Sequence, residues 1–174
     1  MRPCGIFGDT PGESILMNNA AWVMRKTPLF LLPKTGQERF QPIHVRDMAA
    51  LMAECGQDHT QNMEKDACGP DAPTAVELFS RIRQATGSLA LVGAPGFLDE
   101  KIITTLTQPI NWWTKDILLD ADDLMLMTSG LTTANNPDDP DIATRRSVLS
   151  WIDEVGPNLG KEYISSMKRY YSKK

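Results

Sequence analysis

Arg39 and Arg46 are side chains whose type and spacing could bind a charged ligand. A guanidinium holds its donors in a planar fork, which matches the oxygens of a phosphate or a carboxylate. We therefore predict that both bind substrate, with structural ion pairs as the alternative. His44 and Asp47 flank Arg46, and we interpret them as a strand residue and a helix cap rather than as catalytic groups.

Three glycines, Gly5, Gly8 and Gly12, have a spacing similar to a dinucleotide-binding fingerprint. That fingerprint needs a strand before its first glycine and an acidic residue at the end of a second strand. Only four residues precede Gly5, and no such acidic residue completes the unit. A turn that follows a strand is the favoured interpretation.

Tyr170 and Lys174 are four residues apart, the spacing at which a lysine can lower the pKa of a tyrosine acid/base. They lie among the last residues of the sequence, so a solvated basic tail is favoured and no catalytic residue is predicted. Cys55, His59 and Cys68 have zinc-binding side chains, but no C-x-x-C pair and no fourth ligand accompany them. We therefore predict free thiols and no metal site.

Two stretches carry a family resemblance: Arg2–Asp9, with the sequence RPCGIFGD, and Arg39–Ala49, with the sequence RFQPIHVRDMA. Together they resemble the second half of an extended or atypical short-chain dehydrogenase/reductase of the NAD-dependent epimerase/dehydratase family. The second stretch is closest to the branch that contains the nucleotide-binding accessory subunit of respiratory complex I. The resemblance implies that the nicotinamide end of a cofactor passes a run of four residues: Pro3, Cys4, Gly5 and Ile6.

The resemblance also implies an α/β fold, the C-terminal part of a Rossmann-like structure with few short strands plus helices. The N-terminal dinucleotide-binding half of the family, with its phosphate-binding glycine turn and its catalytic Tyr-x-x-x-Lys pair, is expected before Arg2 and is not in this sequence. NAD or NADP is then expected only together with that half, and no cofactor is expected for this chain alone.

Apolar periodicity and turn residues predict the elements. Thr74 to Glu77 has the capping-box pattern that starts a helix, and Gly87 ends it. Further helices are predicted over 13–26, over 47–56 with Asp47 as the cap, and around 97–106, 115–127, 148–155 and 159–171. Strands are predicted over 28–33 and 39–45, as two strands or a hairpin, and over 63–68 and 89–92. We divide the chain into a Rossmann-tail and substrate-side α/β region, 1–92, and a mainly helical region, 93–174, packed as one compact unit.

Composition limits the function classes. A chain of 174 residues with 41% hydrophobic content is expected to form one domain. With 18 basic and 22 acidic residues its net charge is -4, which does not favour nucleic acid. No apolar run approaches the roughly 20 residues that span a bilayer. Three cysteines and no visible signal peptide fit a soluble protein of a reducing compartment, cytoplasm or organelle matrix or stroma.

Two functional hypotheses follow. The first is the substrate-side portion of an NAD(P)-dependent epimerase, dehydratase or reductase, acting on a small molecule and not catalytic by itself. The second is a non-catalytic accessory or interaction subunit of a larger assembly, complex I-like or other. In either case we expect a protein partner or a second copy to cover an exposed strand edge.

Overall fold

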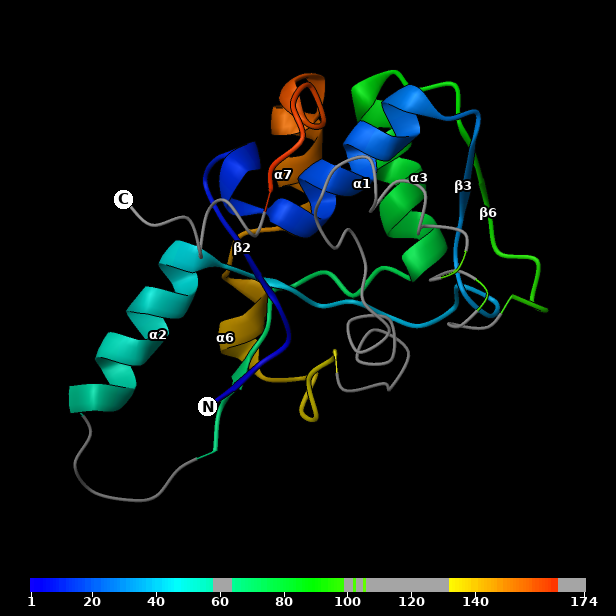
Figure 1. Cartoon of the computed structure of the whole chain (residues 1–174). Coiled ribbons are helices and arrows are strands. Elements are labelled where there is room, and N and C mark those ends of the chain that lie inside the picture. The colour runs from blue at the N-terminus through cyan, green and yellow to red at the C-terminus, as the bar shows by residue number, and fades with distance from the viewer. Residues whose placement is uncertain (58–63, 99–101, 103–104, 106–131, 166–174) are drawn as a thin grey trace.

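The computed structural model of the chain describes residues 1–57, 64–98, 102, 105 and 132–165 (Figure 1). These residues form a mixed α/β structure of short strands and helices, which confirms the predicted fold class at this level. Among them, no helix has both the length and the apolar character needed to cross a membrane.

The strands form three parallel pairs. β1 (Arg2–Pro3) pairs with β5 (Asp66–Ala67), β2 (Ile6–Phe7) pairs with β4 (Ile43–His44), and β3 (Leu29–Leu31) pairs with β6 (Leu91–Gly93). Of the two alternatives for 28–45, the hairpin is wrong, because β3 and β4 belong to different pairs. Parallel strands need a crossover connection, and each pair here encloses at least one helix in the sequence between its members.

The helices start close to their predicted positions. α1 (Ile15–Lys26) follows a short 3-10 helix, η1 (Pro11–Glu13). In α3 (Ala75–Thr86), the Thr74 hydroxyl accepts from the Glu77 N–H at 3.2 Å, and the Glu77 carboxylate accepts from the Thr74 N–H at 2.7 Å. These bonds confirm the predicted capping box, and Gly87 ends the helix with a left-handed φ of 67°.

The predicted cap of the second helix is wrong. α2 (Val45–Gln57) begins two residues before Asp47, which therefore lies in its first turn. The Asp47 carboxylate instead accepts from the backbone N–H of Arg146 at 2.7 Å and pairs with the Arg146 guanidinium. This carboxylate joins α2 to the segment between α6 (Pro140–Ala143) and α7 (Val148–Val155), and α7 matches the helix predicted over 148–155.

The prediction of a helix over 159–171 is wrong for residues 159–165, the part of this range that the structure describes. α7 is followed by a 3-10 helix, η2 (Gly156–Asn158), and then by irregular chain. Two asparagines of α1 form hydrogen bonds with the backbone of this irregular segment. Asn18 bonds the N–H of Gly160 and the C=O of Glu162, and Asn19 bonds the N–H and the C=O of Ile164, all within 3.0 Å. These side-chain bonds replace the helical ladder. The helices predicted around 97–106 and 115–127, and residues 166–171, lie largely or wholly outside the described residues.

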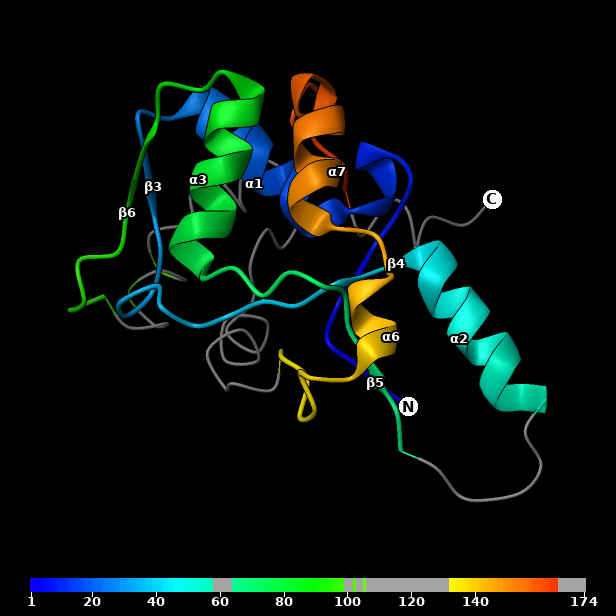
Figure 2. The same ribbon diagram turned by 180° about the vertical axis from the view of Figure 1, so that it is seen from behind.

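Two apolar clusters hold the strands from opposite faces. Phe7, on one face of the β2–β4 pair, packs against Trp151 of α7 with ring centroids 5.3 Å apart. It belongs to the larger core, which α1, α3 and α7 share (Figure 2). Ile43, on the other face, joins Leu51 of α2 and Ala67 of β5 in a small second cluster. α2 therefore stands apart from α1, α3 and α7, as both views show.

A disulfide joins Cys4, which follows β1, to Cys68, which follows β5, with Cα atoms 5.4 Å apart. The prediction of free thiols is therefore wrong for these two residues, although Cys55 is free as predicted. Their separation of 64 residues in the sequence concealed the pair. The bond fixes β1 against β5 at a place where the hydrogen-bonded pairing covers only two residues of each strand.

We expect the double substitution Cys4→Ser and Cys68→Ser to lower the free energy of unfolding by up to about 4 kcal/mol, from the entropy of the loop that the bond closes. Denaturant titration would measure the loss. Dithiothreitol should lower the stability of the wild type similarly and leave the double variant unchanged. Cys55→Ser is the control and should respond to the reductant as the wild type does; an insensitive wild type would show that the bond does not hold the fold.

Candidate functional site

Polar side chains gather at the carboxyl end of the β2–β4 pair. Asp9 follows β2 by two residues, His44 is the last residue of β4, and Arg46 follows it in the first turn of α2. Because the two strands are parallel, their carboxyl ends meet at the same edge. In open parallel sheets that edge is where ligands bind. We call these three residues the strand-end cluster.

Asp9 is the centre of the strand-end cluster. Its Oδ2 accepts from Nε of Arg46 and lies equally close to Nη2 of the same guanidinium, both at 2.8 Å. Its Oδ1 lies 3.2 Å from Nε2 of His44. Asp9 is 42% exposed and Arg46 is 66% exposed, so water and small solutes reach this ion pair.

His44 is held in one orientation. Its side chain is 2% exposed, and its Nδ1 accepts from the backbone N–H of Arg46 at 3.2 Å. A neutral imidazole has one acceptor and one donor nitrogen, so the proton lies on Nε2, facing Asp9. The ring also meets the edge of Phe7 with centroids 5.1 Å apart. His44 is therefore a strand residue, as predicted, and its side chain faces inward.

Arg46 and Arg39, the two predicted substrate-binding residues, are not brought together by any contact that they make. Arg39 donates from Nη1 to the carbonyl of Ala72 at 2.6 Å and forms an isolated backbone bridge with Thr74. Arg46 therefore makes the structural ion pair of the alternative, with Asp9, whereas the printed side-chain bond of Arg39 goes to a backbone carbonyl. Their contact with a substrate stays a prediction.

The predicted cofactor-facing run is exposed at three of its four residues. Pro3, Gly5 and Ile6 are open to solvent, and Ile6 is 52% exposed. Gly5 has a φ of 123°, which a residue with a side chain rarely adopts, and a Cβ there would lie 3.7 Å from the Cβ of Pro42. Cys4 is the exception, because it is 8% exposed and its sulfur is bound to Cys68.

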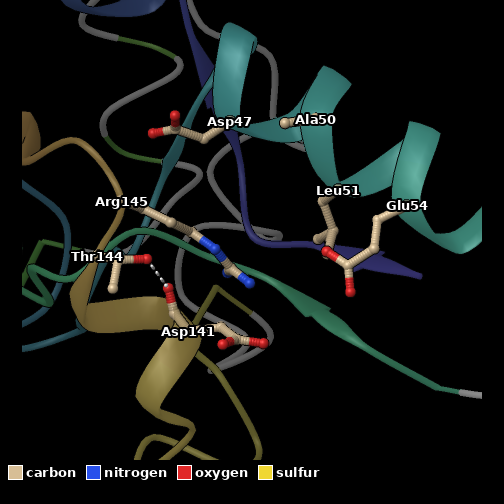
Figure 3. A pocket seen from close by; sticks show the side chains of 7 residues that line it. All are labelled: Asp47, Ala50, Leu51, Glu54, Asp141, Thr144 and Arg145. Carbon is tan, nitrogen blue, oxygen red and sulfur yellow. Dashed lines mark hydrogen bonds between the residues drawn. The ribbon is translucent and has the colours of Figure 1, made fainter.

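A cleft of about 330 Å³ lies between α2 and the α6 segment (Figure 3). It is lined by seven residues: Asp47, Ala50, Leu51, Glu54, Asp141, Thr144 and Arg145. None of the predicted site residues is among them. Figure 3 shows the Arg145 side chain extending between the two elements, where its Nη1 donates to the carbonyls of Asp66 and Cys68 at 3.1 and 2.6 Å.

The charges of this cleft are largely matched within the chain. Lys65 lies 3.2 Å from Glu54 and 3.7 Å from Asp141, while Asp47 pairs with Arg146. The hydrogen bond to Glu54, together with the charges of Glu54 and Asp141, holds the pKa of Lys65 above its usual value. The cleft is therefore a polar joint between α2, α6 and β5, and its ion pairs would compete with a charged ligand.

Asp66, the first residue of β5, accepts several hydrogen bonds at the start of that strand. It is buried and accepts from Arg2 at 2.5 Å and from the N–H groups of Asn135 and Asn136 at 2.8 and 3.0 Å. Burial raises the pKa of Asp66, but the bonds from Asn136, Arg2 and Asn135 outweigh it and hold the pKa below the usual value.

Sequence reasoning gave no role to Asp9 or Asp66. Asp66 begins a short strand, and Asp9 closely follows one. The position of Asp9 just after a strand is a signal that could have identified it as the partner of Arg46. Within the described ranges, no group of three or more His, Cys, Asp and Glu side chains could hold a metal ion. Cys68 cannot serve as a zinc thiolate while it is in the disulfide, and His59 lies outside those ranges.

A comparison of the sequence with protein-family models gives no match, and a comparison with curated proteins gives none either.

We expect the neutral side chain of His44 to be the Nε2–H tautomer, because the Arg46 N–H occupies Nδ1. Long-range ¹⁵N–¹H correlation spectra at high pH distinguish the two tautomers. The chain has two histidines, so His59→Gln leaves a single imidazole to assign. The same tautomer should persist in Asp9→Asn, and an Nδ1–H imidazole in the wild type would contradict this geometry.

We expect Asp66→Asn to lower the free energy of unfolding at pH 7 by about 1–3 kcal/mol, because a neutral amide replaces a buried carboxylate that accepts three hydrogen bonds. The folded pKa of Asp66 lies below its unfolded value, so this stabilisation is present above about pH 4 and is lost as the pH falls through the folded pKa. The difference between the wild type and the variant should therefore shrink in acid. Asp153→Asn, at an exposed ion pair, is the control, and a difference that stays constant down to pH 2 would argue against the assigned role.

Proposed function

We propose that this chain is the substrate-side portion of an NAD(P)-dependent epimerase-, dehydratase- or reductase-like protein and is not catalytic by itself. The observation that carries the proposal is the adjacency of the two stretches that resemble this family. Ile6 lies opposite Ile43 and Phe7 opposite His44 in a parallel pair. The strand after the arginine-proline pair thus runs beside the strand that leads into the helix of the second stretch, as a Rossmann-like arrangement requires.

The exposed run supports a role beside a nicotinamide ring. Pro3, Gly5 and Ile6 offer an exposed apolar surface, which is suited to contact with a flat ring. The nicotinamide, when bound to the remaining half of the protein, would supply the hydride chemistry. Among the described residues of this chain, the contribution is to cover the ring and exclude water, with Cys4 held behind that surface by its disulfide.

Arg46 supports a role in substrate binding. Its guanidinium is exposed at the strand-end edge and is oriented by Asp9. A phosphate or carboxylate of a substrate would compete with the Asp9 carboxylate for the same donors. Arg39 stands on the segment that leads into β4, and its position there is fixed by its bonds to Ala72 and Thr74.

A second candidate is a non-catalytic accessory or interaction subunit of a larger assembly, complex I-like or other. The observation that favours it is the exposure of large apolar side chains around α2, Ile6 and Met52 among them. Apolar surface of this kind is typical of contact with another protein. The two candidates differ in whether the assembled protein turns over a nicotinamide cofactor.

The test is the mass and the nucleotide content of the protein isolated from its native source under gentle conditions. We expect the purified 174-residue chain to retain no nicotinamide nucleotide, and the native species to contain a glycine-turn nucleotide-binding unit together with NAD(H) or NADP(H). Intact mass spectrometry, gel filtration and chromatography of the released nucleotides measure these quantities. Hydride transfer by the native species selects the first candidate, and bound nucleotide without turnover selects the second. A native species that holds no nicotinamide nucleotide would overturn the first candidate.

A further inference from the structure

The β3–β6 pair has one buried face and one open face. Leu29 lies opposite Leu91 and Phe30 opposite Val92, so the side chains of each opposed couple share a face. Phe30 is buried and packs against Phe79 of α3 with ring centroids 5.1 Å apart. Leu29 and Leu91, on the other face, are 48% and 68% exposed. Both faces of a parallel sheet are normally covered, so this exposure calls for a contact outside the described residues.

The exposed apolar surface continues past both ends of β6. Leu89, two residues before Leu91, is 91% exposed, and Phe97, in the turn after the strand, is 76% exposed. With Leu91 they are the three most exposed large apolar side chains among the described residues. Figures 1 and 2 both show β3 and β6 side by side at the margin of the molecule, outside α1 and α3. We call Leu29, Leu89, Leu91 and Phe97 the apolar margin.

An exposed lysine lies near each end of the apolar margin. Lys26, the last residue of α1, lines a pocket of about 380 Å³ together with Leu89. Lys34 follows β3, and its backbone N–H and C=O bond the two residues that flank Phe97, at 2.7 and 2.9 Å. The margin therefore combines apolar side chains with basic ones.

The two segments that form the margin are basic, although the chain as a whole is acidic. Residues 24–36 and 87–98 contain three Lys and Arg residues and no Asp or Glu, whereas the net charge of the chain is -4. Arg25, one of the three, donates to two backbone carbonyls near η2, which leave its charge unneutralised. Asp99 and Glu100 follow in the sequence and lie outside the described residues. The charge of the described margin is thus complementary to an anionic partner.

From these observations we propose that the apolar margin binds the surface of an anionic lipid bilayer. Its leucine and phenylalanine side chains enter the boundary between headgroups and acyl chains, where they leave water. Lys26 and Lys34 lie at the level of the headgroups, to which the negative surface potential attracts them. A second copy fits less well, because a two-fold contact would bring the same basic segments of both copies together. The inference goes beyond the proposed function and does not depend on it.

The buried face of the pair holds the margin in place. Phe30, Leu32 and Ala90 belong to the larger core, and the N–H of Leu91 donates to the carbonyl of Pro28 at 2.9 Å. A surface that is already fixed loses little conformational freedom when it binds. The exposed side chains can therefore enter the lipid boundary without refolding of the strands that carry them.

The test is flotation of the full chain with vesicles of phosphatidylcholine alone, or of phosphatidylcholine and phosphatidylserine in equal parts. We expect binding to the mixed vesicles at low salt. Binding should be about tenfold weaker to phosphatidylcholine alone, or to mixed vesicles in about 1 M salt, because the attraction between the lysines and the lipid is then absent or screened.

The double variant Leu89→Gln and Leu91→Gln should bind the mixed vesicles about tenfold more weakly or less, because two leucine side chains no longer leave water. Phe97→Gln is a second, independent variant and should weaken binding in the same direction. The matched control is Leu16→Gln with Met52→Gln, two exposed apolar residues of α1 and α2, and it should bind as the wild type does. Circular dichroism verifies that each variant folds.

Lys26→Gln with Lys34→Gln should weaken binding to the mixed vesicles and leave binding to phosphatidylcholine unchanged. A wild type that binds neither kind of vesicle, or both equally, would overturn the lipid surface, as would margin variants that bind like the control. A wild-type dimer in gel filtration that only the margin variants convert to a monomer would assign the margin to a second copy instead. None of these measurements involves a nicotinamide nucleotide, so they leave the proposed function to its own test.

Discussion

The attachment of residues 2–7 to two distant parts of the chain is the constraint on which the rest of the described structure depends. This run bonds first to β5 and then to β4, and the Cys4–Cys68 bond closes the first of these contacts covalently. Each ladder is two residues long, so hydrogen bonds alone would hold it weakly. Once the run is fixed, Phe7 points into the core beside Trp151 while Ile6 faces the side of α2.

That constraint also sets the chemistry at the sheet edge. Because β2 and β4 run in the same direction, the residues after each strand meet, and Asp9 comes against both His44 and Arg46. Buried His44 has both ring nitrogens facing polar groups, while the ion pair of exposed Arg46 is screened by solvent.

Local signals in the sequence predicted the local structure well. The Thr74 capping box, the Gly87 helix end and the helix over 148–155 follow from residues that are close together in the sequence, and all are present. The errors concern partners far apart in the sequence. Cys4 and Cys68 are separated by 64 residues, and Asp47 bonds Arg146 across 99, so no spacing rule connects them. Asn18 and Asn19 look like ordinary helix residues, yet their amides decide the course of 160–164.

Those two amides have a consequence for how freely the segment beyond η2 can change during evolution. Asn18 and Asn19 recognise backbone atoms of residues 160–164, which every amino acid except proline provides alike. Exposed Lys161 and Glu162 can therefore drift without loss of these bonds. Gly160 cannot, because a Cβ there would lie 2.3 Å from the backbone nitrogen of Trp22. Variation among descendants of this chain should accordingly collect at 161 and 162 and spare the asparagine pair and the glycine.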